Sequence, residues 1–457
     1  MAGPALDHAY RYLRPSSLER VGSATHLELA TSGGGEAPHF FTGQLTAPKR
    51  AADAMLTVVR VARSRFHVPA AMLARILAES DPVVTCQDGA VRFESFSACC
   101  GVYARLDLDA GALRAEHAGR GATNVDFNAE MRALLARVRP TEDVRLAVGR
   151  DELRVTRRTK EHAAADVVER RVALPLRWLR GFGEVAAVAA RMTPQLEVSG
   201  VEARKLLRAL PRPTGGGGKP AWVTHSGKGL RLARHDAAGA VRVAGIERAS
   251  LLVDVAGDAQ RLVLYGEPSG ASAWELHHPE ARFVLLLSPE PWRGFSGEGG
   301  LLEDLARSRT ASAVAAVRAS LTWQASIDAA GLARAHGLAA TEVSSALAAL
   351  AARGLVGYDL AKQAYFHREL PFAMDAIESM HPRLEAARKL VAAAAVEGLA
   401  ATEDRVTARV RSTDGVAYAV RGDGDAWRCT CTWYAKHKDT RGPCKHVLSV
   451  QLSQEAP

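Results

Sequence analysis

Four residues near the C-terminus have the types and the spacing of metal ligands. Cys429 and Cys431 form a Cys-x-Cys pair, and after twelve residues Cys444 and His446 form a Cys-x-His pair. Three thiolate sulfurs and one imidazole nitrogen fill the tetrahedral shell that Zn²⁺ prefers, and they leave no position open for a substrate. The pattern therefore predicts a structural zinc site at these four residues.

The first ligand pair is expected on a β-strand. Two Asp-Gly dipeptides, at 414–415 and 423–424, separate short alternating segments and predict an antiparallel meander. Side chains two residues apart in a strand point to the same side, so Cys429 and Cys431 would present both thiols together.

The second ligand pair is expected at the start of a helix. Pro443 precedes it, and residues 447–452 form an apolar helical pattern. The positive end of the helix dipole favours the thiolate form of Cys444. His437 is an alternative to His446 as the fourth ligand, but it lies among lysines between the two pairs, where a solvent-exposed side chain is expected.

Cations and aromatic side chains surround these ligands in the sequence. Such a mixture suits phosphate contact combined with base stacking, which would make the segment a nucleic-acid or partner contact. The alternative is a solvated loop with Trp433 packed on the zinc core, and the residues alone leave both open. The candidate contact residues are Arg428, Trp433, Lys436, Lys438, Arg441 and Lys445.

The two pairs, with Trp427 before the first and Gly442-Pro443 before the second, resemble the SWIM zinc finger over about the last fifty residues. This resemblance implies a zinc-bound ββα module that takes part in DNA binding or protein interaction.

Two N-terminal motifs extend the resemblance over the whole chain. Residues 97–103 (SACCGVY) and 123–128 (TNVDFN) are similar to motifs in bacterial SWIM proteins encoded beside MoxR-type AAA+ ATPases and von Willebrand factor A proteins. The resemblance implies an adaptor or recognition subunit, with such an ATPase or von Willebrand factor A protein as its partner. We expect no enzymatic activity.

Composition limits the class of protein. The chain has 457 residues, of which 47% are hydrophobic and 24% charged, so it has enough apolar residues for a folded core. Its net charge of +9 permits nucleic-acid binding without demonstrating it. Residues 1–15 have no apolar signal-peptide core, and no apolar stretch approaches a membrane span. Few cysteines, clustered like metal ligands, indicate a reducing compartment, so we expect a cytoplasmic protein.

The pattern of helices and strands predicts an α+β multidomain protein. The expected divisions are a flexible tail at 1–35, an α+β domain at 36–140, an α+β subdomain at 141–210, a Gly/Pro linker at 211–220, a β-rich domain at 221–310, a winged-helix region at 325–375, and a connecting helix with the zinc module at 376–457.

A winged helix-turn-helix is predicted from helices at 326–335 and 340–353 and a hairpin formed by 355–360 and 363–367. Its second helix has one basic residue, at its end, so a protein-packing role is expected rather than base readout. An alanine-rich helix is predicted at 382–398. The better candidates for nucleic-acid contact in this region are Lys362, His367 and Arg368.

One other group of residues could do chemistry. Asn124, Asp126 and Asn128 would share a face if extended, and with Glu94 or Asp107 they could bind a cation or assist hydrolysis. A turn that satisfies its own backbone is the favoured interpretation. No catalytic site is predicted.

Overall fold

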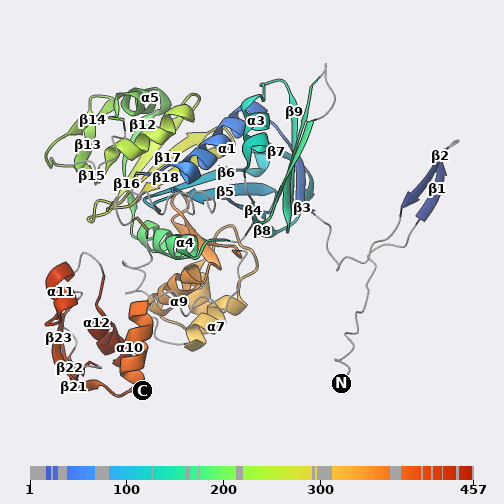
Figure 1. Cartoon of the computed structure of the whole chain (residues 1–457). Coiled ribbons are helices and arrows are strands. Elements are labelled where there is room, and N and C mark those ends of the chain that lie inside the picture. Colours follow the sequence, from blue (N-terminus) through green and yellow to red (C-terminus); the bar gives the residue numbers. More distant parts are fainter. Residues whose placement is uncertain are drawn as a thin grey trace, which may run out of the picture.

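The protein is a mixed α/β, multidomain chain with several sheets, as the sequence predicts (Figure 1). Its structure is a computed structural model. It describes residues 17–21, 24–28, 39–66, 82–125, 127–159, 165–172, 174–212, 220–290, 294–295, 311–370, 382–402, 405–412, 415–424, 426–438 and 442–454. In these ranges no helix is both long enough and apolar enough to cross a membrane.

The largest sheet has eight antiparallel strands in the order β12-β16-β17-β18-β6-β5-β4-β8. The strands are β4 (Val83–Gln87), β5 (Ala90–Phe96), β6 (Val102–Leu108), β8 (Gly121–Asn124), β12 (Thr193–Ser199), β16 (Arg261–Gly266), β17 (Ser272–His278) and β18 (Ala281–Leu287). The central strands are buried on both faces, which explains their long runs of valine, leucine and phenylalanine.

This sheet crosses the predicted domain boundary. Strand β12, before the predicted 211–220 linker, pairs with β16 after it, and β18 pairs with β6 from Ala281↔Leu108 to Leu287↔Val102. Strands β16, β17 and β18 of the predicted β-rich domain at 221–310 therefore belong to a sheet that also contains strands from before the linker. The strand pattern was recognised, but a pattern of single strands carries no information on which distant strand each one pairs with. Residues 213–219 of the linker lie outside the described residues.

Three smaller sheets lie before the predicted winged-helix region in the chain. A five-stranded sheet has the order β11-β10-β9-β3-β7, a three-stranded sheet has the order β14-β13-β15, and β1 and β2 form a hairpin within the predicted N-terminal tail. Their strands are β1 (Ser17–Val21), β2 (Ala24–Glu28), β3 (His39–Leu45), β7 (Leu113–Ala118), β9 (Asp143–Gly149), β10 (Glu152–Arg158), β11 (Ala165–Arg170), β13 (Ala221–Ser226), β14 (Gly229–Ala233) and β15 (Val241–Val243).

Helices cover both faces of the eight-stranded sheet. On one face α1 (Pro48–Arg63) shares a core with the five-stranded sheet, α3 (Ala129–Ala136), α5 (Gly200–Ala209) and the 3-10 helix η3 (Ile246–Asp254), while a short 3-10 turn, η2 (Ala110–Ala112), follows β6. On the other face α4 (Leu176–Ala189) buries Trp178 and Phe182 against Phe96, with ring centroids 5.6 and 5.0 Å apart.

The helices and hairpin predicted for the winged-helix region are present. They are α8 (Ala329–His336), α9 (Ala340–Ala352), β19 (Val356–Asp359) and β20 (Ala364–His367), preceded by α7 (Ala311–Ala319). Asp328 caps α8 by accepting a hydrogen bond from the Gly331 N–H, and Gly337 ends the helix in the left-handed conformation. Helix α9 packs against α4 and α7, so most of its residues are buried.

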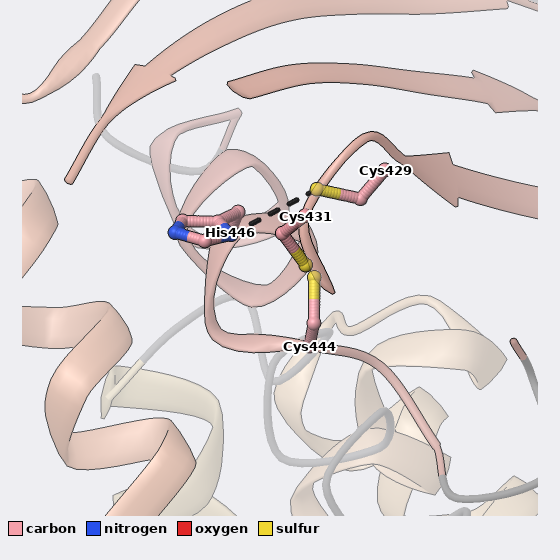
Figure 2. A group of neighbouring side chains, drawn as sticks. All are labelled: Cys429, Cys431, Cys444 and His446. Carbon is pink, nitrogen blue, oxygen red and sulfur yellow. Dashed lines mark hydrogen bonds between the residues drawn. The ribbon is translucent and has the colours of Figure 1, made fainter. Parts of the chain in front are cut away.

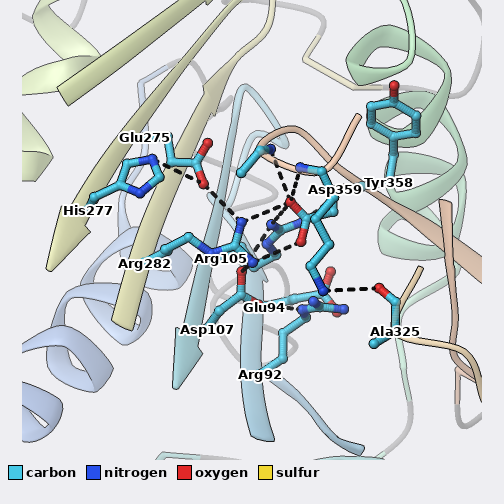
Figure 3. A network of polar contacts seen from close by, with 12 residues as sticks. Arg92, Glu94, Arg105, Asp107, Glu275, His277, Arg282, Ala325, Tyr358 and Asp359 are labelled. Atoms are coloured by element: carbon cyan, nitrogen blue, oxygen red, sulfur yellow. Dashed lines mark hydrogen bonds and ion pairs between the residues drawn. The ribbon is translucent and has the colours of Figure 1, made fainter. Parts of the chain in front are cut away.

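A buried network of ion pairs attaches this hairpin to the α4 face of the large sheet (Figure 3). Arg282 of β18 donates to both carboxylate oxygens of Asp359, at 2.9 and 2.8 Å. Arg105 of β6 donates to the Tyr358 carbonyl at 2.9 Å, and Arg368 donates to Glu94 of β5. The hairpin is thus fixed to strands far from it in sequence.

The network changes the interpretation of the hairpin residues. Arg368 and His367 are buried, so the prediction that they contact nucleic acid is wrong. Their polar groups are used internally, because Arg368 pairs with Glu94 and the His367 ring accepts a hydrogen bond from the Trp323 N–H. Of the three candidates, Lys362 alone remains exposed.

The C-terminal region consists of a four-stranded antiparallel sheet, order β21-β22-β23-β24, and three helices. Its elements are α10 (Pro382–Ala392), β21 (Val396–Ala401), β22 (Arg405–Arg411), β23 (Ala417–Asp423), β24 (Ala426–Cys429), α11 (Thr432–His437) and α12 (Lys445–Ser453). The predicted meander is therefore confirmed, with one strand more than expected.

The extra strand arises where a helix was predicted. The alanine-rich helix ends at Ala392 instead of residue 398, Ala394 adopts a positive φ of 50°, and β21 then pairs with β22. Alanine's helix propensity is a weak preference, and pairing with a neighbouring strand outweighs it here.

Helix α12 packs on one face of this sheet, and α10 packs on α12. Alternate residues of β22 and β23, such as Ala408, Val410 and Val420, are buried in the core that α12 completes with Val447. The residues between them point to the opposite face and are exposed.

Candidate metal centre

The four predicted ligands meet in the structure (Figure 2). One donor atom from each of Cys429, Cys431, Cys444 and His446 lies within 4.8 Å of the others, and all four residues are buried. In a tetrahedral shell with metal–sulfur bonds of about 2.3 Å, neighbouring sulfurs are roughly 4 Å apart. The arrangement is therefore compatible with a metal site.

The first pair is positioned differently from the prediction. Cys429 is the last residue of β24, but Cys431 is the N-cap of α11, and its sulfur accepts a hydrogen bond from the Tyr434 N–H at 3.3 Å. The strand was expected to continue through both cysteines. It ends before Cys431 because that residue begins the turn into α11, and the thiols meet through this turn.

The second pair is positioned as predicted. Cys444 is the N-cap of α12, and its sulfur accepts a hydrogen bond from the Val447 N–H at 3.4 Å. His446 lies in the first turn, where its Nδ1 is 3.8 Å from the Cys429 sulfur and its ring stacks on Tyr418 with centroids 4.5 Å apart. The cluster thus connects the end of β24 to the start of α12.

The three cysteines influence one another's ionisation. A hydrogen bond from Cys429, followed by contacts with His446 and the Val447 N–H, lowers the pKa of Cys444 to about 4 despite its burial. The pKa of Cys429 is raised, first by the hydrogen bond that Cys429 makes to Cys444 and then by burial. Burial also raises the pKa of Cys431. A divalent cation would allow all three thiols to ionise, because it neutralises the sulfurs that otherwise repel each other.

The predicted contact residues form a less compact group than the ligands. Lys436 lies on α11 and Lys438 directly follows it, so this segment is a helix where a loop was predicted. Both lysines are exposed, as is Arg428 on β24. Arg441 lies outside the described residues.

Two of these residues have partners beside the cluster. The Arg383 guanidinium of α10 lies 4.7 Å from the ring centroid of the half-buried Trp433, and the Lys445 ammonium donates to the Ser412 hydroxyl at 3.3 Å. They line a cavity of about 380 Å³ next to Cys431 and His446.

The sequence contained a further cationic pattern that was not recognised. Strand β22 reads Arg-Val-Thr-Ala-Arg-Val-Arg, so every arginine falls on the exposed side of the strand. Arg421 of β23 is exposed on the same face. Alternation of arginine with apolar residues was the signal that could have identified this surface.

Three of the other residues considered for chemistry have structural roles. Asn128 caps α3 by accepting hydrogen bonds from Glu130 N–H and Met131 N–H. Glu94 and Asp107 pair with arginines in the buried network, and Asp126 lies outside the described residues. These partners account for Asn128, Glu94 and Asp107, whereas Asn124 is buried and its side-chain amide has no hydrogen-bond partner among the described residues.

Comparisons with known proteins add little. No protein-family model matches the chain, and no curated protein matches it. Among solved structures, the chain is similar to proliferating cellular nuclear antigen from Entamoeba histolytica, with 9% identity over 55% of this chain and 98% of that chain and a TM-score of 0.37. A similarity this weak supports no conclusion about fold or function.

Proposed function

We propose that the chain is a zinc-dependent recognition protein. Cys429, Cys431, Cys444 and His446 would hold one structural Zn²⁺, and the module that it stabilises would bind nucleic acid. The module resembles a SWIM zinc finger in its ligand pattern. The observation that supports this proposal is the convergence of three thiols and one imidazole, all buried, in a module whose surface carries exposed cations.

The donor set favours a structural role for the metal. Four protein ligands satisfy a tetrahedral zinc ion completely, whereas catalytic sites keep one position for water or substrate. The cluster also joins β24 to α12, so zinc binding would stabilise the packing of the helix on the sheet. Metal binding of this kind contributes directly to folding free energy.

The winged-helix-like elements are better suited to packing than to nucleic-acid recognition. Helix α9 would be the recognition helix, but it is buried between α4 and α7. The exposed cations Arg428, Lys436 and Lys438 lie instead in the zinc module. We therefore assign nucleic-acid contact to the C-terminal module.

The test is made on the full-length protein. Elemental analysis should find one zinc ion per chain. Fluorescence anisotropy should show binding to labelled DNA or RNA that weakens steeply between about 50 and 200 mM salt. Removal of zinc with a chelator should abolish this binding. Zinc-loaded protein that does not bind nucleic acid at low salt would refute the proposal, and the search would turn to protein partners, including the predicted ATPase or von Willebrand factor A protein.

A further inference from the structure

The face of the four-stranded sheet opposite α12 is exposed and rich in arginine. Three neighbouring strands contribute to it, and lysine does not occur on these strands. The exposed arginines are Arg405, Arg409 and Arg411 of β22, Arg421 of β23 and Arg428 of β24.

Two of these arginines lie directly opposite each other. The register of β23 and β24 pairs Arg421 with Arg428, and both side chains are exposed on the same face. Like charges in directly opposed positions destabilise a sheet. Departures from such local rules concentrate at functional sites, where a bound ligand can compensate for them.

Acidic side chains neutralise only part of the surface. Asp423 pairs with Arg405 and Arg421, at 3.2 and 2.9 Å, and Glu397 pairs with Arg411 at 2.9 Å.

The other two arginines have no such partner. Glu397 of β21 lies opposite Arg409 in the strand register, but its carboxylate pairs with Arg411. Among the described residues no acid forms an ion pair with Arg409 or Arg428, and both arginines are exposed. The sequence has further acids at 403–404, 414 and 425, which lie outside the described residues, so only strand residues are assigned to this surface.

We propose that this arginine face of β22, β23 and β24 binds the phosphodiester backbone of nucleic acid. The inference rests on the proposed function and gives its binding surface. A planar guanidinium matches the oxygens of a phosphate with two parallel hydrogen bonds, which a lysine ammonium cannot do. Asp423 is shared by Arg405 and Arg421, so a phosphate at Arg428 would further reduce the repulsion between Arg421 and Arg428.

The face is suited to the backbone rather than to the bases. The aromatic residues of these strands, Tyr418 and Trp427, point to the other side, where Tyr418 stacks on His446 and Trp427 packs over Gly422. The arginine face therefore has no aromatic side chain on which a base could stack. Binding by phosphate contacts alone is strongly salt-dependent and carries little sequence preference.

The test compares two charge-matched double variants of the full-length, zinc-loaded protein. Arg409→Gln/Arg428→Gln alters the sheet face, and Lys436→Gln/Lys438→Gln removes the same charge from α11 and its end. Neither sheet arginine forms an ion pair with a described acid, and Glu397, which lies opposite Arg409, keeps its pair with Arg411, so these substitutions leave no described carboxylate unpaired. Anisotropy is measured with single-stranded DNA, single-stranded RNA, duplex DNA and polyglutamate over a salt series.

The sheet variant should bind about tenfold or more weakly, and the slope of log affinity against log salt should fall by about 2, close to one per lost phosphate contact. The α11 variant should lose less. Single-stranded and duplex probes then show which form the surface prefers. If the sheet variant binds as the wild type does while the α11 variant loses binding, this inference is wrong and the proposed function stands. Wild-type protein that binds no nucleic acid, or binds polyglutamate equally well, refutes both.

Discussion

Arg368 donates hydrogen bonds to both carboxylate oxygens of Glu94, although the two residues are 274 positions apart in the chain. Both side chains are almost completely buried, and the Tyr103 hydroxyl donates to the same carboxylate at 2.5 Å. This pair joins the end of the β19–β20 hairpin to the middle of the eight-stranded sheet. Burial raises the pKa of Glu94, but Arg368 and Arg92 outweigh it, so the net shift is downward.

The Glu94→Gln substitution should strongly destabilise the protein. It removes the charge that compensates Arg368, and a buried charge without its partner costs about 3 to 5 kcal/mol. Urea unfolding followed by circular dichroism measures the change. The matched control is Asp254→Asn, which breaks the half-exposed pair of Asp254 with Arg60 and should cost under about 1 kcal/mol. Equal losses for the two variants would contradict the importance of the buried pair.

His367 should make stability fall as the pH decreases from about 6.5 to 4. Burial lowers the pKa of His367 to about 4, and its Nδ1 accepts a hydrogen bond from the Trp323 N–H at 2.6 Å, which requires an unprotonated nitrogen. In this window the unfolded chain binds a proton that the folded chain excludes. The contribution is at most about 1.4 kcal/mol per pH unit.

The measurement compares urea unfolding of the wild type and His367→Asn at pH 7 and pH 4.5. The asparagine oxygen can accept the same hydrogen bond and does not titrate. The exposed Glu369 carboxylate near His367 is present in both proteins, so its titration cancels in the comparison. The variant should lose less stability on acidification, and an identical loss in both proteins would show that His367 does not cause it.

The Cys444→Ser substitution should release the metal and unfold the C-terminal module while the large sheets stay folded. Metal binding and folding of such modules are coupled, and a serine hydroxyl is a poor zinc ligand. Limited proteolysis should cut within 382–457, and the zinc content should fall below one ion per chain. Cys99→Ser, outside the cluster, is the control and should keep its zinc. Full zinc content in Cys444→Ser would show that this ligand assignment is wrong.

The Arg248→Met substitution should destabilise the protein by about 3 kcal/mol or more. Arg248 is fully buried and donates to the carbonyls of Gly101, Ala244 and Ser288 at 2.6 to 2.7 Å, and burial lowers its pKa to about 10. Methionine leaves the Ala244 and Ser288 carbonyls without this donor, each at a cost of about 1 to 3 kcal/mol, while the Gly101 carbonyl keeps the hydrogen bond from the Ser288 N–H. Arg204→Met is the control, since Arg204 donates to the Gly257 carbonyl at the surface. Thermal unfolding of both variants compares their losses of stability, and the loss should be much larger for Arg248→Met.

The cluster of three cysteines and one histidine could be predicted because it depends on residue types and short spacings. The N-cap position of Cys444 followed from a proline and a helical pattern close by in sequence, and the structure confirms it. The turn that brings Cys431 into place was not predicted, since alternation alone continues the strand through it. Residue types and spacing thus predicted the four residues of the cluster, whereas the backbone turn at Cys431 was not predicted.

The long-range contacts could not be predicted from one sequence. Arg282 and Asp359 belong to segments that the sequence placed in different domains, and no local pattern links them. Their pairing depends on how β18 and the hairpin pack, which is a property of the whole fold. The same reason explains why His367 and Arg368 were taken for surface residues.

The pairing of β6 with β18 has a consequence for how the protein is made. During synthesis β6 leaves the ribosome long before β18. The edge of β6 that pairs with β18 therefore stays unpaired while the intervening segments are synthesised. Folding of this sheet therefore cannot be completed until Leu287 has left the ribosome, and a chaperone would have its greatest effect before that point. The cluster of Cys429, Cys431, Cys444 and His446 follows later and closes only a short loop, so it can assemble independently of that delay.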